Sequence, residues 1–348
     1  MKILLISDAW RPQVNGVVRT LENTQAELVA MGHEVMVIGP DRFRCVPLPG
    51  YREIPVALRP GAQLGRTIEA FGPTCIHVAT EGPLGMAARR WCKGHEMPFT
   101  SSYHTRFPEY LRLRAPVPTG LTYRWLRRFH GAATKTMVRT RTQMKLLATQ
   151  GFSNLGLWPG GVDTMLFRPR RERLLDLPRP IALYAGRVAP EKSLEDFLSV
   201  DFPGSKVIVG DGPARAGLQK RFPEAHFLGY HHGEALARRI AASDVFVFPS
   251  RTDTLGLVML EAMACGVPVA AFPVPGPLDV VLNGVSGCLH EDLGEAMAGA
   301  LKLDRWDCRV FAGEFSWRQC TQAFVDQLQP SAISPPSING GVLSTAQA

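Results

Sequence analysis

The sequence predicts an α/β protein built from two doubly wound, Rossmann-like domains that face a central cleft. Two observations carry this prediction. Short apolar runs alternate with helical patterns along the chain, as they do where crossover helices connect the strands of a parallel sheet. The alternation then starts again near the middle of the 348 residues, a length that corresponds to two domains at about 150 residues each. The composition, 45% hydrophobic and 20% charged, excludes collagenous, coiled-coil and disordered proteins.

The first half opens with an apolar run at 2–7, continues with a helical pattern before Gly32 and returns to an apolar run at 34–39. Strand, helix and strand with short connections make one right-handed crossover unit. Further buried strands are predicted at 75–78, 99–103 and 154–158. A new series begins at 180–186, with strands at 206–209, 226–228, 244–249 and 267–272 and helices near 193–199, 212–221, 233–242 and 256–265. We expect domains at 1–165 and 166–310, a closing helix at 311–329 and a disordered tail at 330–348.

Cysteine usage and hydropathy indicate the compartment. The seven cysteines are scattered, with no Cys-x-x-Cys pair, which is typical of buried thiols in a reducing cytoplasm. The start of the chain lacks the apolar stretch of a secretion signal. The most apolar region, 255–278, contains Glu261 and four prolines, so it cannot be a continuous membrane-spanning helix.

The segment 249–268 carries the clearest site signal. A buried strand leads into a polar loop, and Leu255 and Gly256 open a helix whose first-turn amides would bind an anion. Glu261 lies inside this otherwise apolar helix, where an acid costs free energy unless it has a partner. A ribose diol and a nearby arginine are both possible partners.

This segment resembles the signature of the retaining nucleotide-sugar glycosyltransferases of the two-Rossmann-domain (GT-B) type. That family includes bacterial glycogen synthases, sucrose synthases and lipid mannosyltransferases. The resemblance rests on Asp253 and Glu261, which are separated by seven residues and followed by Ala-Met-Ala-Cys-Gly-Val-Pro-Val. Asp253 stands where the family often has Glu. The resemblance, extended to the Gly-rich loop at 12–21, implies a donor-binding set of Gly16, Asp253, Leu255, Gly256, Leu257, Val258 and Glu261.

Two further loops resemble the same family. The loop at 186–194 is similar to its Gly-Arg-x-x-x-x-Lys-Gly loop, with Ser193 in place of Gly, and this implies that Arg187 and Lys192 hold the donor diphosphate. Without the resemblance, two solvated surface cations would be the simpler interpretation. The segments 77–85 and 102–111 resemble a narrower subgroup, the mannosyl-, sulfoquinovosyl- and glucosyltransferases that act on glycolipids. There the equivalent of His104 contacts the transferred sugar, so the catalytic residues implied are His104, Arg187 and Lys192.

Charge is concentrated in the first half, which has 23 basic and 11 acidic residues up to residue 170. Leucine and aromatic residues interleave with the arginines between 106 and 145, a pattern that suits the headgroup layer of an anionic membrane. We expect a monotopic contact that delivers a lipid acceptor, with the protein held peripherally at the cytoplasmic membrane. The residues concerned are Arg112, Arg114, Arg124, Trp125, Arg127 and Arg128. A basic solvated face over a buried apolar stripe is the alternative.

The predicted activity is hexosyl transfer with retention, in which the acceptor hydroxyl attacks from the side that the diphosphate leaves. The resemblance implies no protein nucleophile. No Asp-x-Asp occurs in the chain, so neither a metal nor another cofactor is expected. The donor stays open between GDP-mannose, UDP-glucose, UDP-glucuronate and UDP-galactose. The acceptor stays open between diacylglycerol, phosphatidylinositol and a growing or soluble glycan.

Two other function classes compete with this one. The sequence pI of about 9.3 fits a nucleic-acid-binding protein, but no nucleic-acid motif accompanies the basic stripe, and no nucleic-acid partner is expected. An epimerase or a phosphorylase could use the same fold. A phosphorylase would need a lysine-bound pyridoxal phosphate and a longer chain.

Overall fold

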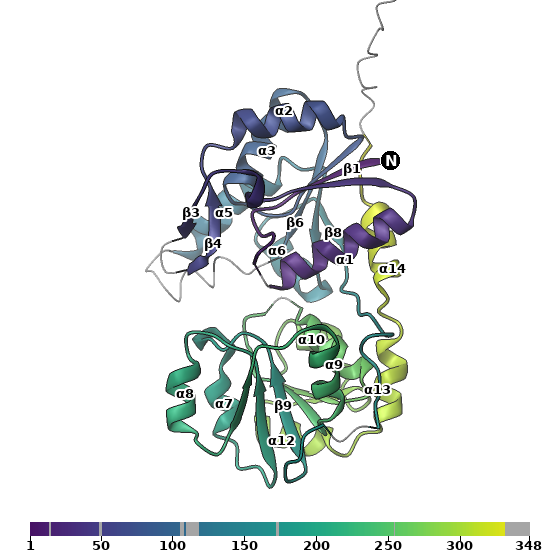
Figure 1. Ribbon diagram of the computed structural model, residues 1–348. Coiled ribbons are helices and arrows are strands. Elements are labelled where there is room, and N and C mark those ends of the chain that lie inside the picture. The colour runs from purple at the N-terminus through teal and green to yellow at the C-terminus, as the bar shows by residue number, and fades with distance from the viewer. Residues whose placement is uncertain are drawn as a thin grey trace, which may run out of the picture.

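The computed structural model places the chain in two α/β domains, one above the other in Figure 1. It describes residues 1–13, 15–48, 51–104, 108, 118–171, 174–253 and 255–330, with the backbone alone at 51–53. Each domain is organised around one six-stranded sheet, and apolar core clusters lie against its faces. The predicted fold class, an α/β protein with two Rossmann-like domains, is confirmed.

The sheet of the upper domain has the order β2-β1-β5-β6-β7-β8, with every neighbouring pair parallel. The strands are β1 (Lys2–Ile6), β2 (Glu34–Ile38), β5 (Cys75–Val78), β6 (Phe99–Tyr103), β7 (Lys135–Val138) and β8 (Leu155–Leu157). The helices are α1 (Gly16–Ala30), α2 (Gly61–Phe71), α3 (Pro83–Gly94), α5 (Thr119–His130) and α6 (Arg141–Thr149), beside the turn η1 (Pro40–Arg42) and the hairpin of β3 (Cys45–Leu48) and β4 (Tyr51–Ala57). The four apolar residues of β1 are fully buried, as a strand covered on both faces requires.

Strand β7 was not predicted from the sequence. It reads Lys-Thr-Met-Val, so it opens on polar residues where a buried strand usually shows an apolar run. Thr136 is nevertheless fully buried, because its hydroxyl lies 3.3 Å from that of Ser101 on the neighbouring strand β6. A side-chain hydrogen bond inside the sheet therefore replaces the apolar contact that sequence patterns detect.

The sheet of the lower domain has the order β11-β10-β9-β12-β13-β14, again parallel throughout. Its strands are β9 (Ile181–Ala185), β10 (Ser205–Val209), β11 (His226–Gly229), β12 (Val245–Phe248), β13 (Val269–Ala271) and β14 (Gly287–Leu289). Its helices are η2 (Pro190–Lys192), α7 (Leu194–Leu198), α8 (Arg215–Arg221), α9 (Gly233–Ala241), α10 (Leu257–Ala264), α11 (Pro277–Val280), α12 (Leu293–Ala300) and α13 (Arg305–Ala312).

The strand order identifies where a ligand would bind. In the upper sheet the order reverses between β1 and β5, and in the lower sheet it reverses between β9 and β12. Crossover connections leave in opposite directions at such a point, so a crevice forms outside the carboxyl ends of the strands. The loops at 186–193 and 249–256 follow β9 and β12, and both belong to the segments that the sequence singled out.

The chain passes between the domains twice, and the two crossings lie against each other. Val162 of the outward crossing forms a parallel bridge with Ser316 of the return, and its N–H donates to the Phe315 carbonyl at 2.8 Å. Within the stretch predicted as the closing helix, α13 has ended at Ala312 and α14 (Trp317–Val325) packs beside α1 of the upper domain (Figure 1). The predicted tail lies, from residue 331 on, outside the described residues.

Candidate active site

The loop after β12 turns into helix α10 at Gly256, whose backbone is left-handed with φ of 75°. A Cβ at this position would lie 2.7 Å from the Phe248 ring and 2.8 Å from the Met259 methyl group, so only glycine fits. No side chain of a described residue caps this helix. The first-turn amides, among them those of Leu257 and Val258, therefore form a place for an anion, which the helix dipole also favours.

Glu261 lies in the second turn of the same helix, and its side chain is 6% exposed. Its Oε1 accepts from Nη1 of Arg19 on α1 at 2.7 Å, so this ion pair joins the two domains. Its Oε2 has no hydrogen-bond partner among the described residues. Burial raises the pKa of the Glu261 carboxyl, and Arg19 opposes that rise. An arginine thus takes one carboxylate oxygen, and the other is left for a further donor such as a hydroxyl group.

Lys192 ends the short helix η2, which follows β9, and Asp253 follows β12, the neighbour of β9 in the sheet. The Lys192 Nζ lies 2.5 Å and 2.8 Å from the two carboxylate oxygens of Asp253. Only about a quarter of each side chain is exposed, 22% for the lysine and 26% for the aspartate. Lys192 is therefore not a solvated surface cation. A phosphate that entered here would compete with Asp253 for the ammonium group.

The charges of Arg187 and Arg19, which belong to opposite domains, both act on Tyr230. Burial raises the pKa of the Tyr230 hydroxyl, and the guanidinium groups of Arg19 and Arg187 oppose that rise. The pKa of Tyr184, which is raised by burial, is raised further by Asp253 and lies within the influence of Tyr230. Tyr230 is therefore under the influence of both Arg187 and Arg19, the partner of Glu261.

Gly16 is the first residue of α1 in the upper domain. Asn15 caps this helix, because its side-chain oxygen accepts from the N–H groups of Val17 and Val18 at 3.0 Å and 3.1 Å. A Cβ at Gly16 would meet open space. Packing within the protein therefore does not require glycine here, whereas the close approach of a ligand would.

His104 directly follows β6. Its Nε2 lies 2.8 Å from the Ser102 hydroxyl, which lies 3.1 Å from Nε2 of the buried His77. The His104 ring meets Trp158 edge to face, with the ring centroids 5.6 Å apart. Burial lowers the pKa of His104 well below its ordinary value, and the neighbouring Arg139 lowers it further. The imidazole is therefore neutral at pH 7 and can exchange hydrogen bonds with a sugar hydroxyl.

Sequence reasoning missed Arg19 and Arg139. Arg19 lies within the Gly-rich segment 12–21 but was given no role, because its partner Glu261 is 242 positions away in the sequence and in the other domain. Arg139 follows β7, the strand that the sequence did not reveal. It is 4% exposed, although it lies inside a segment whose arginines were expected on a surface.

Helix α5 carries the exposed face of the predicted membrane segment. Leu121 and Trp125 are 60% and 41% exposed and lie beside Arg124, while the alternating Tyr123 and Leu126 are buried. Arg127 and Arg128 line a hollow of about 400 Å³ together with Arg89, Lys93, Gly131 and Ala132. Arg112 and Arg114 lie outside the described residues. No helix in the described part of the chain is long and apolar enough to cross a bilayer.

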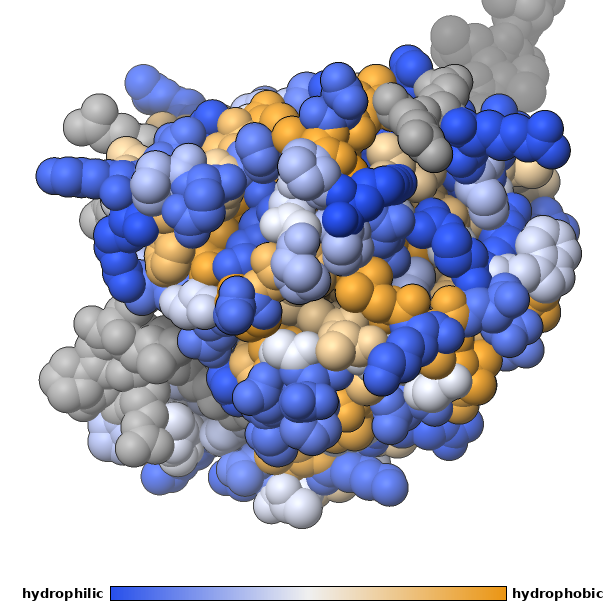
Figure 2. All heavy atoms as spheres, turned by 90° about the horizontal axis from the view of Figure 1, so that it is seen from below, coloured by the Kyte–Doolittle hydropathy of each residue, from blue (hydrophilic) through white to orange (hydrophobic). Residues whose placement is uncertain are grey.

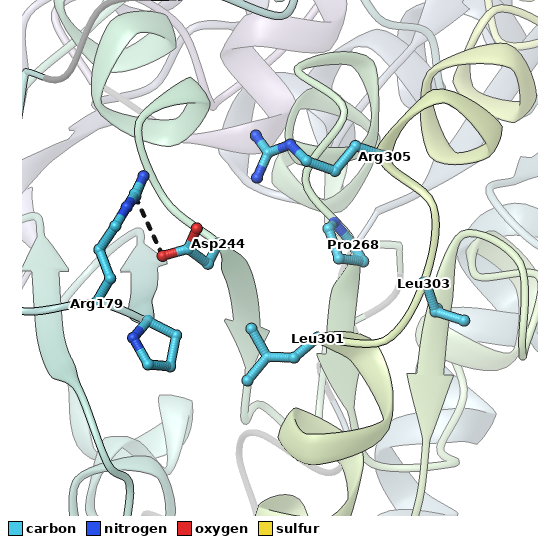
Figure 3. A pocket seen from close by; sticks show the side chains of 7 residues that line it. Arg179, Asp244, Pro268, Leu301, Leu303 and Arg305 are labelled. Atoms are coloured by element: carbon cyan, nitrogen blue, oxygen red, sulfur yellow. Dashed lines mark hydrogen bonds and ion pairs between the residues drawn. The ribbon is translucent and has the colours of Figure 1, made fainter.

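A second hollow, of about 550 Å³, opens at the opposite edge of the lower sheet, where its strands begin (Figure 3). Its charges are already paired: Arg179 lies 3.2 Å from Asp244, and Arg305 donates to the carbonyls of Ser243 and Ala241. Figure 2, which views the molecule from below the lower domain, shows apolar residues interspersed with hydrophilic ones. This hollow does not meet the loops that carry the candidate site.

Comparison with known proteins identifies the family of this chain. The profile described as "Glycosyltransferase Family 4" matches residues 14–166, and that described as "Glycosyl transferases group 1" matches residues 179–303. A "GDP-mannose-dependent alpha-mannosyltransferase" of Mycobacterium tuberculosis is 30% identical over 316 residues, which cover 83% of each chain. The "Sulfoquinovosyl transferase SQD2" of Arabidopsis thaliana is 33% identical over 79% of this chain and 60% of its own.

Solved structures show the same architecture. A sucrose-phosphate synthase from Thermosynechococcus elongatus superposes with a TM-score of 0.77 at 21% identity, over 93% of this chain and 97% of that one. At this level of identity the likeness concerns the fold. The paired Rossmann-like domains, the two profile matches and the 30% identity over most of the chain lead to one conclusion: this protein belongs to the group 1 glycosyl transferases and is a hexosyltransferase of the GT-B fold.

Proposed function

We propose that this protein is a retaining glycosyltransferase that moves a hexosyl unit from a nucleotide sugar to a lipid acceptor at the cytoplasmic membrane surface. The relatives support the donor class, since one is named for GDP-mannose and another for the transfer of sulfoquinovose. The observation that carries the lipid acceptor is the face of α5, where Leu121 and Trp125 are exposed beside Arg124. Exposed apolar and cationic side chains together suit an anionic headgroup layer, where each cation contributes about 1 kcal/mol.

The donor would lie in the cleft with its diphosphate at the amides that open α10. Arg187 and Lys192 would supply the cations, and the unpaired Oε2 of Glu261 would accept a ribose hydroxyl. Binding would require the diphosphate to draw Lys192 away from Asp253, which frees that carboxylate to accept from hydroxyls of the sugar. The Lys192 ammonium group would then pass from the carboxylate to the phosphate, and the sugar hydroxyls would replace it as hydrogen-bond donors to Asp253.

The chemical step follows from where charge develops. As the glycosidic bond to the diphosphate lengthens, negative charge grows on the leaving phosphate, and the helix amides and two cations stabilise it. The acceptor hydroxyl attacks from the same side, and its proton passes to the departing phosphate. His104, neutral and held by Ser102, would orient the sugar ring. Closure of the domains would exclude water that would otherwise hydrolyse the donor. We propose turnover without a metal ion or other cofactor.

The test is a transfer screen with purified protein, the four nucleotide sugars named above, and vesicles that contain diacylglycerol or phosphatidylinositol. Sugar that enters the lipid phase with one donor, and that is lost in Glu261→Ala but kept in Glu295→Ala, supports the proposal. Glu295 is a matched control, because it is an exposed acid on α12. Transfer only to a soluble or polysaccharide glycan would refute the lipid acceptor. Nucleic-acid binding without nucleotide release from any donor would refute the proposed reaction.

A further inference from the structure

Three residues leave the upper sheet side by side at its carboxyl edge. Tyr103, at the end of β6, pairs with Val138 at the end of β7, and Val138 pairs with Leu157 at the end of β8. The next residue of each strand is therefore a neighbour of the other two: His104, Arg139 and Trp158. This is the edge at which ligands of such sheets bind.

Arg139 is buried, and its guanidinium forms no ion pair with any of the residues that the structure describes. Its side chain is 4% exposed, and its guanidinium lies 4.8 Å from the centre of the Trp158 ring. Apart from the Cys320 thiol close by on α14, neither of its terminal nitrogens has a hydrogen-bond partner among the described residues. A guanidinium stays protonated in proteins, so it cannot avoid the desolvation cost by losing its charge. A buried, unpaired cation at a ligand-binding edge needs an explanation.

The position of Arg139 relates it to the reacting sugar. The Trp158 ring contacts both side chains, since its centroid lies 5.6 Å from that of the His104 ring and its centre lies 4.8 Å from the Arg139 guanidinium. Three residues further on, the Thr142 N–H donates to Oδ1 of Asp279 in the lower domain at 2.9 Å, which places the start of α6 at the domain interface. Asp279 Oδ2 is itself buried, with no hydrogen-bond partner in the described part of the chain. Arg139 therefore lies between the carboxyl edge of the upper sheet and the start of a helix that contacts the lower domain, and its guanidinium is out of solvent.

We propose that Arg139 forms a subsite for an anionic group carried by a substrate beside the transferred hexose. The planar guanidinium, stacked on Trp158, presents its N–H groups in a fork that matches the paired oxygens of a carboxylate, sulfonate or phosphate. The group belongs either to the transferred sugar, as an acidic substituent, or to the acceptor, as a phosphate next to the attacking hydroxyl. This inference deepens the proposed function and rests on it for the identity of the cleft.

Calorimetric binding to the full chain tests the subsite with ligand pairs that differ only in the acidic group. The donor arm compares UDP-glucuronate with UDP-glucose, and the acceptor arm compares inositol 1-phosphate with inositol in the presence of UDP. We expect a preference for the acidic member in one arm, and Arg139→Met should reduce that preference at least about 30-fold, as expected when one partner of a buried charge pair is removed. Arg139→Lys should keep part of it, and the neutral ligand should bind all three proteins alike.

Two results would overturn the proposal. One is a wild-type protein that prefers the acidic member in neither arm, or a preference that Arg139→Met leaves unchanged. The other concerns the melting temperature of the ligand-free Arg139→Met protein. Removal of an unpaired buried charge predicts a melting temperature at or above that of wild type. A value well below wild type would show that the arginine serves folding. Calorimetry measures binding without turnover. The test of the subsite therefore gives a result even if the transfer screen shows no glycosylation of lipid.

Discussion

Replacing Arg19 with methionine tests the ion pair that joins the two domains. The change removes the guanidinium that contacts Glu261 Oε1 at 2.7 Å and keeps an unbranched side chain of similar length. Glu261 Oε2 already has no partner among the described residues. The variant would therefore contain a carboxylate with 6% exposure and two unpaired oxygens, and we expect it to be less stable than wild type at pH 7.

The magnitude follows from the burial of the two partners. Removing one partner of a fully buried ion pair costs about 3–5 kcal/mol. The Arg19 side chain is 37% exposed, so water can enter its place, and this reduces the expected loss to about 2 kcal/mol. Burial raises the pKa of Glu261, and Arg19 opposes that rise, so the pKa should be higher still in the variant. A carboxyl whose pKa is higher in the folded state takes up a proton on folding, so the loss should shrink as the pH falls through that raised pKa.

Urea unfolding of a double-mutant cycle measures this effect. The cycle compares wild type, Arg19→Met, Glu261→Gln and the double variant at pH 7 and pH 5. The coupling free energy should be about 2 kcal/mol at pH 7, because glutamine leaves no charge unpaired when the arginine is absent. Arg221→Met is the control; its pair with Glu195 is more than half exposed on both sides and should cost less than about 1 kcal/mol. A coupling below about 0.5 kcal/mol, or a loss equal at both pH values, would refute the reasoning.

Further predictions concern the donor site, the membrane face and the chemistry. Gly256→Ala should lower the affinity for UDP or GDP and also the free energy of unfolding, because its Cβ would lie 2.7 Å from the Phe248 ring. Calorimetry measures the affinity, and urea unfolding measures the stability. Lys192→Met should lower kcat/KM at least about 100-fold through loss of leaving-group stabilisation; an unchanged kcat/KM would remove the lysine from the mechanism. Replacing Arg127 and Arg128 with glutamine should weaken binding to anionic vesicles about 30-fold. The same charge change at the end of α8 is the control and should leave this binding unchanged. If the Arg127/Arg128 variant still sediments fully with the vesicles, the membrane contact is wrong. Transfer should continue in EDTA, and activity that EDTA abolishes and Mn²⁺ restores would contradict metal-independent turnover.

The fold was predictable because its signals are local. A strand such as β1 is apolar throughout since both of its faces are covered, and Gly256 is recognisable since a strand-loop-helix turn requires its left-handed backbone. The same holds for the separation between Asp253 and Glu261, which is a feature of one continuous segment. Local spacing therefore located the lower half of the candidate site.

The rest of the site could not be predicted, because it depends on contacts between distant segments. Nothing near Glu261 in the sequence indicates that its partner is Arg19, and nothing near Lys192 indicates that it pairs with Asp253 before a donor arrives. Arg139 looked like one more surface cation in a basic stretch, since the polar sequence of the preceding strand concealed its burial. Such contacts, within a domain or between the two, become visible only when the chain is folded.

The paired crossings between the domains have a mechanical consequence. A single linking strand could swivel about any of its backbone bonds, but here Val162 and Ser316 are bridged, and a Cβ on the neighbouring Gly161 would lie 2.7 Å from the Trp317 ring. Two bonded crossings resist twisting more than bending. We therefore expect the domains to open and close by a hinge motion about a single axis. Arg19 and Glu261 would then form the same contact each time the domains close, whichever sugar is bound between the domains.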